Sequence, residues 1–248
     1  MRVVTWNILS GQPTKPDSNL YSAVNSLSAD VLAIHEVDHL QSRSNKIKTV
    51  EEIADKCNFA SWAFAPALIG TPGSKWQPAN HLHSHLQKIE LNTSYGIALL
   101  SKIPVISWEY LNLKGSPVGL PLIVMSPKGA RLMYVADEPR VALAAILENG
   151  ITVITSHLSF VPGVNTWQLR KIKNWAKNLP GKRVFIGDFN ALWFGKAGLK
   201  SLNRSKSYPA WKPKAKFDYI LSNDLTATEI SLPYTGISDH LPIGVEIK

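Results

Sequence analysis

The sequence predicts an α/β sandwich, in which two β-sheets pack together and helices lie outside them. Ten short apolar runs, most of them four to seven residues long and rich in β-branched side chains, have the length and composition of strands. Only three stretches repeat apolar residues at helical spacing. Because strands clearly outnumber helices, we expect the helices to cover sheets rather than to form a bundle of their own.

The expected elements follow one another along the whole chain. The strands are residues 3–6, 31–34, 96–100, 120–124, 131–135, 141–146, 151–155, 183–186, 219–221 and 243–247. Residues 21–27 and 167–179 carry the apolar stripe of a surface helix. In the third expected helix, residues 49–57, Thr49 precedes Glu52 by three positions, which is the spacing of a capping box.

Residues 1–248 are expected to form a single domain. The chain is 45% hydrophobic with a mean hydropathy of −0.04, and it contains no Gly/Ser-rich linker, low-complexity block or fixed-period repeat. No window approaches the roughly 18 apolar residues of a membrane span, and a strand-like run begins at once where a leader would stand. The single cysteine, Cys57, excludes an internal disulfide. We therefore expect a cytoplasmic protein without a transmembrane segment, and a monomer.

Positive charge is concentrated in one stretch of the sequence. The formal net charge is +9, and residues 170–216 hold 13 Lys and Arg side chains with one acid, Asp188. Such a stretch is either a solvated basic face or a surface for a polyanion, such as nucleic acid or anionic lipid headgroups. The position of Asp188 inside it favours the functional interpretation.

Residues 60–94 show weak periodicity and are the hardest part of the chain to assign. His81, His83 and His85 alternate there, so in a strand they would share a face and could bind a metal ion. No cysteine or carboxylate lies close to them in the sequence. We therefore favour the alternative, an exposed polar strand or loop, and assign no function to this segment.

Polar side chains gather at the ends of the expected strands. They are Asn7, His35, Glu36, His157, Asp188, Asn190, Asp218, Asp239 and His240. Gly, Asp and Asn are common turn residues, so a turn explains any one of these ends. A turn does not explain why the ends of six strand segments all carry such residues. Sites in α/β proteins form where strand ends meet loops, so a shared site is the better explanation.

The first role that this set suggests is binding of a divalent metal ion. Hard cations such as Mg²⁺ take oxygen ligands and commonly use one or two carboxylates together with the phosphate of the substrate. Glu36 and Asp239 suit that role, with Asn7 as a neutral oxygen donor.

The second role is hydrolysis of a phosphate ester. Asp188 is the candidate base that orients and deprotonates the attacking water. Asn190, His157 and His240 are candidates to stabilise the charge that develops on the phosphoryl oxygens. Asp218 is the candidate acid that orients His240 through its second ring nitrogen.

Seven motifs in fixed order give this set a family context. They are TWNIL, HEVD, SYGIALLSK, SHLS, GDFN, FDYIL and SDHLPI, and they span nearly the whole chain. Together they resemble the endonuclease/exonuclease/phosphatase superfamily, which includes pancreatic-type deoxyribonucleases, abasic-site endonucleases, neutral sphingomyelinases and inositol-polyphosphate 5-phosphatases. The resemblance implies a four-layered αββα sandwich of two packed mixed sheets, with the site at one end of the paired sheets.

The resemblance also implies a role for each residue. It makes Asn7, Glu36 and Asp239 the metal site, for Mg²⁺ or alternatively Mn²⁺, and His157, Asp188, Asn190, Asp218 and His240 the catalytic set. Tyr95 of SYGIALLSK is a candidate for substrate binding. Arg140, which opens a strand, either braces the site or contacts phosphate. Abasic-site endonucleases carry a tyrosine in place of His157 and usually an acid in place of Leu9, so this chain departs from that branch.

The expected function is a Mg²⁺-dependent phosphodiesterase, a nuclease acting on nucleic acid. The basic stretch motivates that substrate, because phosphate contacts dominate nucleic-acid binding. Lys212, Lys214 and Lys216 lie just upstream of Asp218 and are expected at the rim of the site. The alternatives are a phosphoesterase for phospholipids or inositol phosphates and, in another class, a non-catalytic module that binds polyanions.

Overall fold

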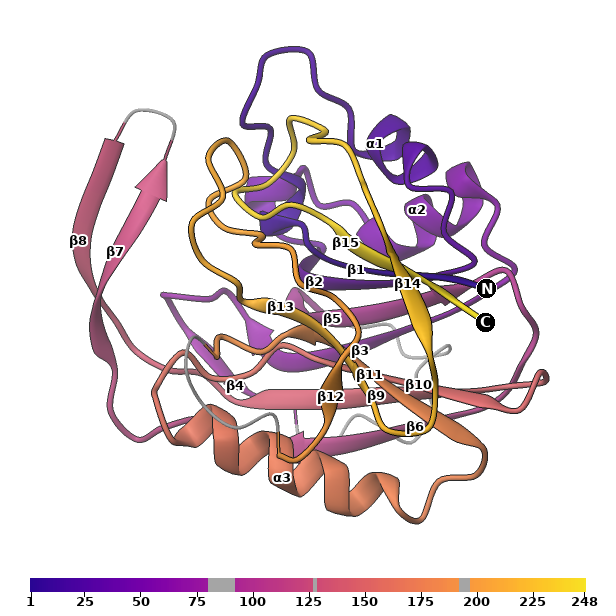
Figure 1. Cartoon of the computed structure of the whole chain (residues 1–248). Helices are drawn as coiled ribbons and strands as arrows, with labels where there is room; N and C mark the ends of the chain where they lie inside the picture. The colour runs from indigo at the N-terminus through magenta and orange to yellow at the C-terminus, as the bar shows by residue number, and fades with distance from the viewer. Residues whose placement is uncertain (80–91, 127–128, 192–196) are drawn as a thin grey trace.

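Two mixed β-sheets form the centre of the molecule (Figure 1). The computed structural model describes residues 1–79, 92–126, 129–191 and 197–248. Within these residues, the larger sheet has seven strands in the order β14 (Ala227–Ile230), β15 (Ile243–Ile247), β1 (Arg2–Asn7), β2 (Val31–His39), β5 (Ser94–Ser101), β3 (Ser61–Gly70) and β4 (Trp76–Pro78). The smaller has six, in the order β12 (Lys200–Ser201), β13 (Asp218–Ser222), β11 (Lys182–Asp188), β10 (Ile151–Ser156), β9 (Arg140–Leu147) and β6 (Val105–Leu113).

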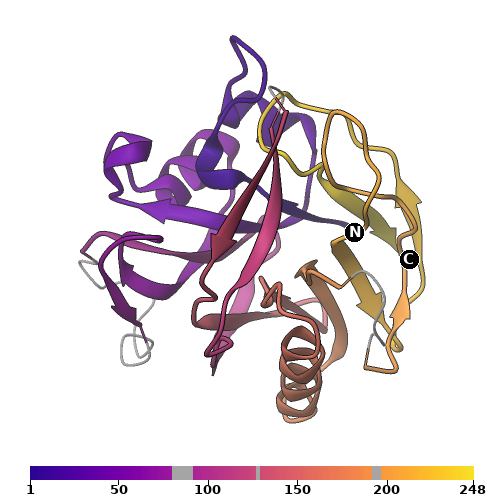
Figure 2. The ribbon, with the colours of Figure 1, turned by 90° about the vertical axis from the view of Figure 1, so that its left-hand side faces the viewer.

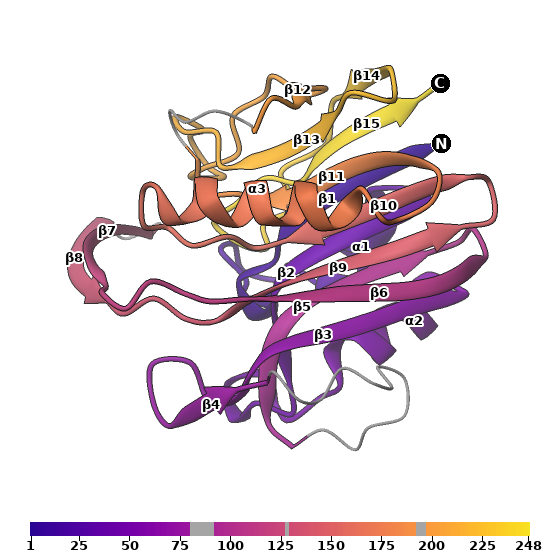
Figure 3. The same cartoon turned by 90° about the horizontal axis from the view of Figure 1, so that it is seen from below.

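Helices cover the outer face of each sheet. Helices α1 (Leu20–Ser26) and α2 (Thr49–Cys57) pack on the larger sheet, and α3 (Val164–Ala176) packs on the smaller one (Figure 3). Two 3₁₀ turns, η1 (Leu9–Gly11) and η2 (Ser42–Ser44), lie in the connections. This arrangement confirms the four-layered αββα sandwich of two packed mixed sheets.

The central strands are buried on both faces, which explains why they consist of continuous apolar runs. Val3 and Val31 belong to the apolar core between the two sheets, whereas Val4, Trp6 and Ile34 belong to the core under α1 and α2. Successive residues of a strand point to opposite faces, so one run of apolar residues supplies two cores.

Two of the long strands, β3 and β6, are not predicted from the sequence. Strand β3 lies in the stretch that shows weak periodicity, and its pairing with β5 shifts register between Pro66 and Leu68. Strand β6 is an edge strand whose residues are mostly half-exposed or exposed, including Ile106, so it lacks the apolar run of a central strand.

Helix α2 has the predicted limits but not the predicted cap. Lys48 occupies the N-cap position, and Thr49 lies inside the helix with its Oγ1 buried and without a hydrogen-bond partner. Glu52 accepts a hydrogen bond from the Tyr21 hydroxyl at 2.6 Å instead of bonding back to the cap. The chain enters α2 from a β-bridge between His39 and Lys48, which places Lys48 at the helix start.

Strands β7 (Leu120–Ser126) and β8 (Gly129–Val135) form a separate antiparallel hairpin. The sequence predicts both strands, but they join neither sheet and project from the body of the sandwich (Figures 1 and 2). None of the helices in the described part of the chain has the length and apolar character needed to cross a membrane.

Candidate active site

The chemically active side chains meet at one end of the paired sheets. Asn7 is the last residue of β1 and Asp188 the last residue of β11, and the 3.1 Å hydrogen bond between their side chains places these strand ends of different sheets at the same end of the sandwich. His157 follows the last residue of β10. Strand β13 runs antiparallel to β11, and its first residue, Asp218, lies in register with Asp188. His240 lies in the loop before β15, which runs antiparallel to β1.

Glu36 reaches the site through an irregularity rather than through a strand end. Strand β2 continues to His39, but its register against β5 shifts between Ile34 and Val37, and Glu36 has a φ of 55°. A bulge of this kind re-aims a side chain at the cost of a strained backbone. The neighbouring His35 is fully buried, where its Nε2 lies 2.8 Å from Thr155 Oγ1 of the other sheet.

Asn7 joins carboxylates from the two sheets. Its Nδ2 donates to Glu36 Oε1 at 2.8 Å and to Asp188 Oδ2 at 3.1 Å, while its Oδ1 accepts from the Leu9 backbone N–H at 3.1 Å. Ser238 supports this arrangement, since its Oγ donates to the Asn7 backbone carbonyl at 2.6 Å. Asn7 therefore sits at the centre of the cluster.

His240 forms a dyad with Asp218. Its Nδ1 lies 2.7 Å from Asp218 Oδ2 and 3.8 Å from Asp188 Oδ2. Burial disfavours the charged ring, but the charges of Asp218 and Asp188 outweigh that effect and raise the pKa of His240 to about 10. The ring is thus an imidazolium at neutral pH, which carries a second N–H donor at Nε2.

His157 has the opposite protonation state. Its Nε2 lies 3.6 Å from Asp188 Oδ2. Burial, reinforced by the positive charge of Arg140, lowers the pKa of His157 well below its ordinary value. The site therefore combines a neutral imidazole with an imidazolium on either side of one carboxylate, a separation of acid and base roles that hydrolases use.

The carboxylates of the site are crowded together, and burial and mutual repulsion disfavour their charged forms. Burial and the charge of Asp239 raise the pKa of Glu36 to about 7, and burial and the charge of Asp218 raise that of Asp188 to about 6. Burial also raises the pKa of Asp239. Among the described residues, Glu36, Asp188 and Asp239 form no ion pair with a Lys or Arg side chain. A bound divalent cation would supply the missing positive charge.

The donor set fits a hard cation. Glu36 and Asp239 offer carboxylate oxygens, with Asn7 between Glu36 and Asp188. Ligand atoms of Asp188, Asp218 and His240 also lie within 4.8 Å of one another. Asp218 and His240 already bond to each other, so the Glu36 and Asp239 side of the cluster has more capacity for Mg²⁺ or Mn²⁺.

Asn190 lies beside Asp188 with a strained backbone, at a φ of 47°. Its backbone N–H donates to Asp188 Oδ1 at 3.1 Å, and its Nδ2 donates to the Leu158 carbonyl at 3.0 Å. Asn165 Nδ2 in turn donates to the Asn190 carbonyl at 2.9 Å. These bonds fix the orientation of the Asp188 carboxylate.

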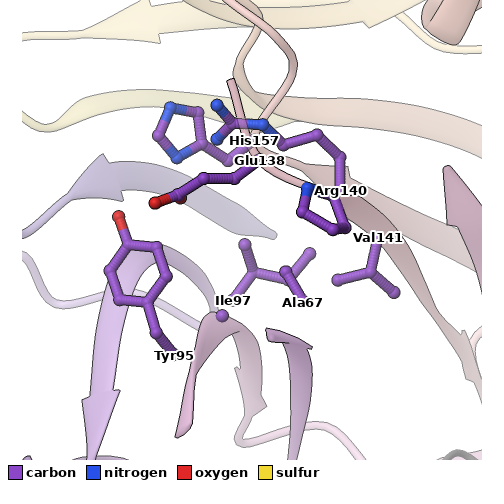
Figure 4. A pocket seen from close by; sticks show the side chains of 9 residues that line it. Ala67, Tyr95, Ile97, Glu138, Arg140, Val141 and His157 are labelled. Carbon is purple, nitrogen blue, oxygen red and sulfur yellow. The ribbon is translucent and has the colours of Figure 1, made fainter. Parts of the chain in front are cut away.

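A pocket opens next to His157 (Figure 4). Tyr95, Glu138 and Arg140 line it with His157, and the Tyr95 hydroxyl points toward the Glu138 carboxylate. Arg140 is 7% exposed and donates to Asp137 Oδ1 at 2.9 Å, while its buried Nε has no hydrogen-bond partner. Arg140 therefore braces the pocket through Asp137 and keeps one donor free.

The three rim lysines differ in environment. The loop of Lys212 and Lys214 is bonded to the segment of Asp239 and His240, since Ala210 N donates to the Asp239 carbonyl at 2.7 Å, and both lysines are exposed. Lys216 instead donates to Ser201 Oγ at 3.0 Å and lies 4.5 Å from the centre of the Tyr219 ring. Lys212 and Lys214 are thus exposed on a loop next to the site, whereas Lys216 links its segment to Ser201.

The basic side chains of residues 170–216 lie on different parts of the fold. Lys182 and Arg183 begin β11 at the end opposite Asp188, and Arg183 forms an ion pair with Asp224 at 3.2 Å. Lys173 of α3 donates to the Ala197 carbonyl at 2.6 Å. The charge asymmetry of the sequence therefore does not translate into a single face. His81, His83 and His85 fall outside the residues that the structure describes.

Glu138 lines the pocket although sequence reasoning did not select it. Burial raises its pKa. The signal was present in the order Asp137, Glu138, Pro139, Arg140, which puts acids directly before a strand. Because β9 runs antiparallel to β10, the residues directly before β9 lie at the same end of the sheet as the last residues of β10.

Comparison with known proteins agrees with this geometry. The family model described as Endonuclease/Exonuclease/phosphatase family matches residues 4–240. No curated protein sequence matches the chain.

Solved structures share the fold at low sequence identity. A family protein from Leptotrichia buccalis C-1013-b is 17% identical, with a TM-score of 0.62, over 100% of this chain and 99% of its own. The human Nocturnin catalytic domain with bound sulfate is 15% identical, with a TM-score of 0.57, over 100% and 93%. Sphingomyelinase C from Streptomyces griseocarneus is 13% identical, with a TM-score of 0.55, over 98% of each chain.

The family model spans the motifs that supply Asn7, Glu36, His157, Asp188, Asp218 and His240, and the fold brings all six together. The chain therefore belongs to the endonuclease/exonuclease/phosphatase family and is a phosphoester hydrolase of that family.

Proposed function

We propose that the protein is a phosphodiesterase that uses Mg²⁺, or alternatively Mn²⁺. The observation that carries this proposal is the cluster of three carboxylates, the buried Asp188 and the half-buried Glu36 and Asp239, with raised pKa values and without a Lys or Arg partner among the described residues. Glu36 and Asp239 would hold the cation, and Asn7, whose Nδ2 donates to Glu36 and Asp188, would position these carboxylates. When bound, the cation would neutralise phosphoryl oxygens and lower the cost of charge development there.

Asp188 is the proposed general base. Its pKa of about 6 leaves it mostly ionised at neutral pH, yet basic enough to accept a proton from the attacking water. Asn7 Nδ2 and the Asn190 backbone N–H hold one oxygen each, so the carboxylate has a fixed orientation.

The two histidines are proposed to act on the phosphoryl group. The His240 imidazolium, held through Nδ1 by Asp218, can donate from Nε2 to an oxygen that gains charge in the transition state. The neutral His157 can donate from one ring nitrogen while its pKa keeps it uncharged. Asn190 supports this group by positioning Asp188.

Nucleic acid is the first candidate substrate. Lys212 and Lys214 are exposed on the loop that is bonded to the His240 segment, where they can contact backbone phosphates on either side of the scissile one. The Tyr208 ring of the same loop lies 5.0 Å from the His240 ring.

We further propose that the protein acts as a monomer in a reducing compartment, in line with the single, buried Cys57.

A phospholipid phosphodiester is the second candidate substrate, and the β7–β8 hairpin favours it. The hairpin exposes Ile123, Leu132 and Tyr134 on the chain segment that leads into Glu138 and Arg140 of the pocket. An amphipathic substrate would find apolar and polar surface side by side there.

A substrate panel tests the proposal. Plasmid DNA, oligoribonucleotides, sphingomyelin, phosphatidylcholine, inositol phosphates and bis(p-nitrophenyl) phosphate would each be incubated with Mg²⁺, Mn²⁺ or EDTA. We expect turnover of at least one phosphodiester that EDTA abolishes. Binding of polyanions without turnover of any member would instead support a non-catalytic module, and turnover of monoesters alone would overturn the diesterase assignment.

A further inference from the structure

Within the described part of the fold, the β7–β8 hairpin is a separate ribbon that joins neither sheet. It leaves the smaller sheet after Leu113 and returns to it at Arg140, which are paired in the β6–β9 ladder. None of the described side chains of the hairpin belongs to the apolar cores of the sandwich. A two-stranded ribbon of this kind is marginally stable by itself, and an exposed apolar surface of this kind marks an interaction site.

Both faces of the hairpin are apolar. On one face, Ile123 pairs with Leu132 and Pro121 pairs with Tyr134. Ile123, Leu132 and Tyr134 are 65%, 69% and 66% exposed.

The other face pairs Leu122 with Met133 and Leu120 with Val135, and Met133 is 43% exposed. A strand that packs on a protein surface normally alternates apolar and polar residues. This ribbon does not alternate, so covering a single face would leave the other exposed to water.

The charge of the segment is purely positive. Residues 118–136 include Lys128 and Arg131 and no Asp or Glu. Arg131 is exposed on β8. Apolar side chains accompanied by basic ones are typical of elements that lie in the interface of an anionic membrane.

The base of the hairpin is fastened to the active site. The Ser116 backbone N–H donates to Asp137 Oδ2 at 2.6 Å, and Asp137 pairs with Arg140 at 2.9 Å. The returning chain supplies Glu138 and Arg140 to the pocket next to His157. Figure 3 shows the hairpin projecting from the end of the sandwich where β1 and β11 end.

We propose that the β7–β8 hairpin inserts into the headgroup region of an anionic lipid bilayer and holds the mouth of the active-site pocket against the membrane. A bilayer surrounds an inserted ribbon and so covers both apolar faces at once, which a second copy of the chain docked on one face would not do. The outer edges of a two-stranded ribbon keep unpaired backbone groups, so the insertion is confined to the hydrated interface.

Vesicle binding tests the proposal with the whole protein. Sedimentation would compare phosphatidylcholine vesicles with and without phosphatidylserine. We expect binding that phosphatidylserine strengthens. The double variant Ile123→Ser/Leu132→Ser should bind roughly tenfold more weakly or worse, because two exposed apolar side chains lose their transfer into lipid.

Matched variants separate the apolar and charged contributions. Ile106→Ser is the control, since Ile106 is 66% exposed on an edge strand away from the hairpin, and its binding should equal that of the parent. Arg131→Gln should weaken binding roughly fivefold with phosphatidylserine and little without it. The melting temperatures and the hydrolysis of bis(p-nitrophenyl) phosphate should stay unchanged in all three, because none of these residues contacts the site.

Three results would overturn the proposal. They are a parent protein that does not bind either vesicle, a double variant that binds as the parent does, and a hairpin-dependent dimer in analytical ultracentrifugation without vesicle binding. The measurement requires no turnover, so its outcome is independent of the proposed reaction.

Discussion

The Asp218→Asn substitution tests how the site keeps His240 protonated. Asp218 is fully buried, and its Oδ2 lies 2.7 Å from His240 Nδ1. Burial alone would lower the pKa of His240, but the carboxylates, Asp218 first, raise it from 6.5 to about 10. Asparagine keeps the size of the side chain and removes its charge, so we expect this pKa to fall by roughly 1–3 units.

The same shift sets a pH dependence of stability. The pKa of His240 is higher in the folded than in the unfolded chain, so the stabilisation is complete below about 6.5 and is lost as the pH rises toward about 10. Within that window this group makes the free energy of unfolding fall by up to about 1.4 kcal/mol per pH unit. In Asp218→Asn the window should end at a lower pH.

The assay combines ring NMR of His240 in metal-free protein with urea unfolding across this pH window and kcat at saturating substrate. We expect kcat to fall by about 10² or more, because the imidazolium loses its fixed orientation and part of its charge. Asp55→Asn, on the exposed face of α2, is the control for removal of a carboxylate. A His240 pKa that stays near 10 in Asp218→Asn would refute the reasoning.

Two further substitutions follow from the geometry. Glu36→Gln should raise the metal concentration required for half-maximal activity, because one anionic oxygen leaves the cation site; an unchanged metal titration would remove Glu36 from the ligand set. Lys212→Ala/Lys214→Ala should weaken nucleic-acid binding and flatten its salt dependence by roughly one unit of log–log slope per lost phosphate contact, with kcat unchanged. Lys216→Ala should lower the melting temperature instead, since Lys216 bonds to Ser201; an unaltered salt slope in the double variant would argue against nucleic acid.

The sequence is most informative where local pattern and topology coincide. Asn7 and Asp188 follow apolar runs that are buried on both faces, and parallel neighbours bring such ends together. Glu36 also follows an apolar run, but β2 continues beyond it. Its position depends on a bulge in the pairing of β2 with β5, which lies about 60 residues away in the sequence. Such a pairing between distant residues cannot be predicted from the residues around Glu36 alone.

Other features depend on partners that are distant in sequence. Lys212, Lys214 and Lys216 look alike in the sequence, and only the fold places Ser201 beside Lys216. The apolar pattern of residues 120–124 and 131–135 predicts strands correctly, but it does not show which surface would cover them. The structure leaves Ile123 and Leu132 exposed, because apolar content indicates a preference for leaving water and not the surface that will provide it.

The most direct test of the proposed metal-dependent hydrolysis compares the parent, Asp188→Asn and Asp55→Asn on one phosphodiester, each with Mg²⁺ and with EDTA. We expect metal-dependent turnover in the parent and in Asp55→Asn, and a kcat lower by about 10²–10⁴ in Asp188→Asn with a near-parental melting temperature. A kcat for Asp188→Asn equal to that of the parent, or turnover that persists in EDTA, would contradict the assignment of Asp188 and of the cation site.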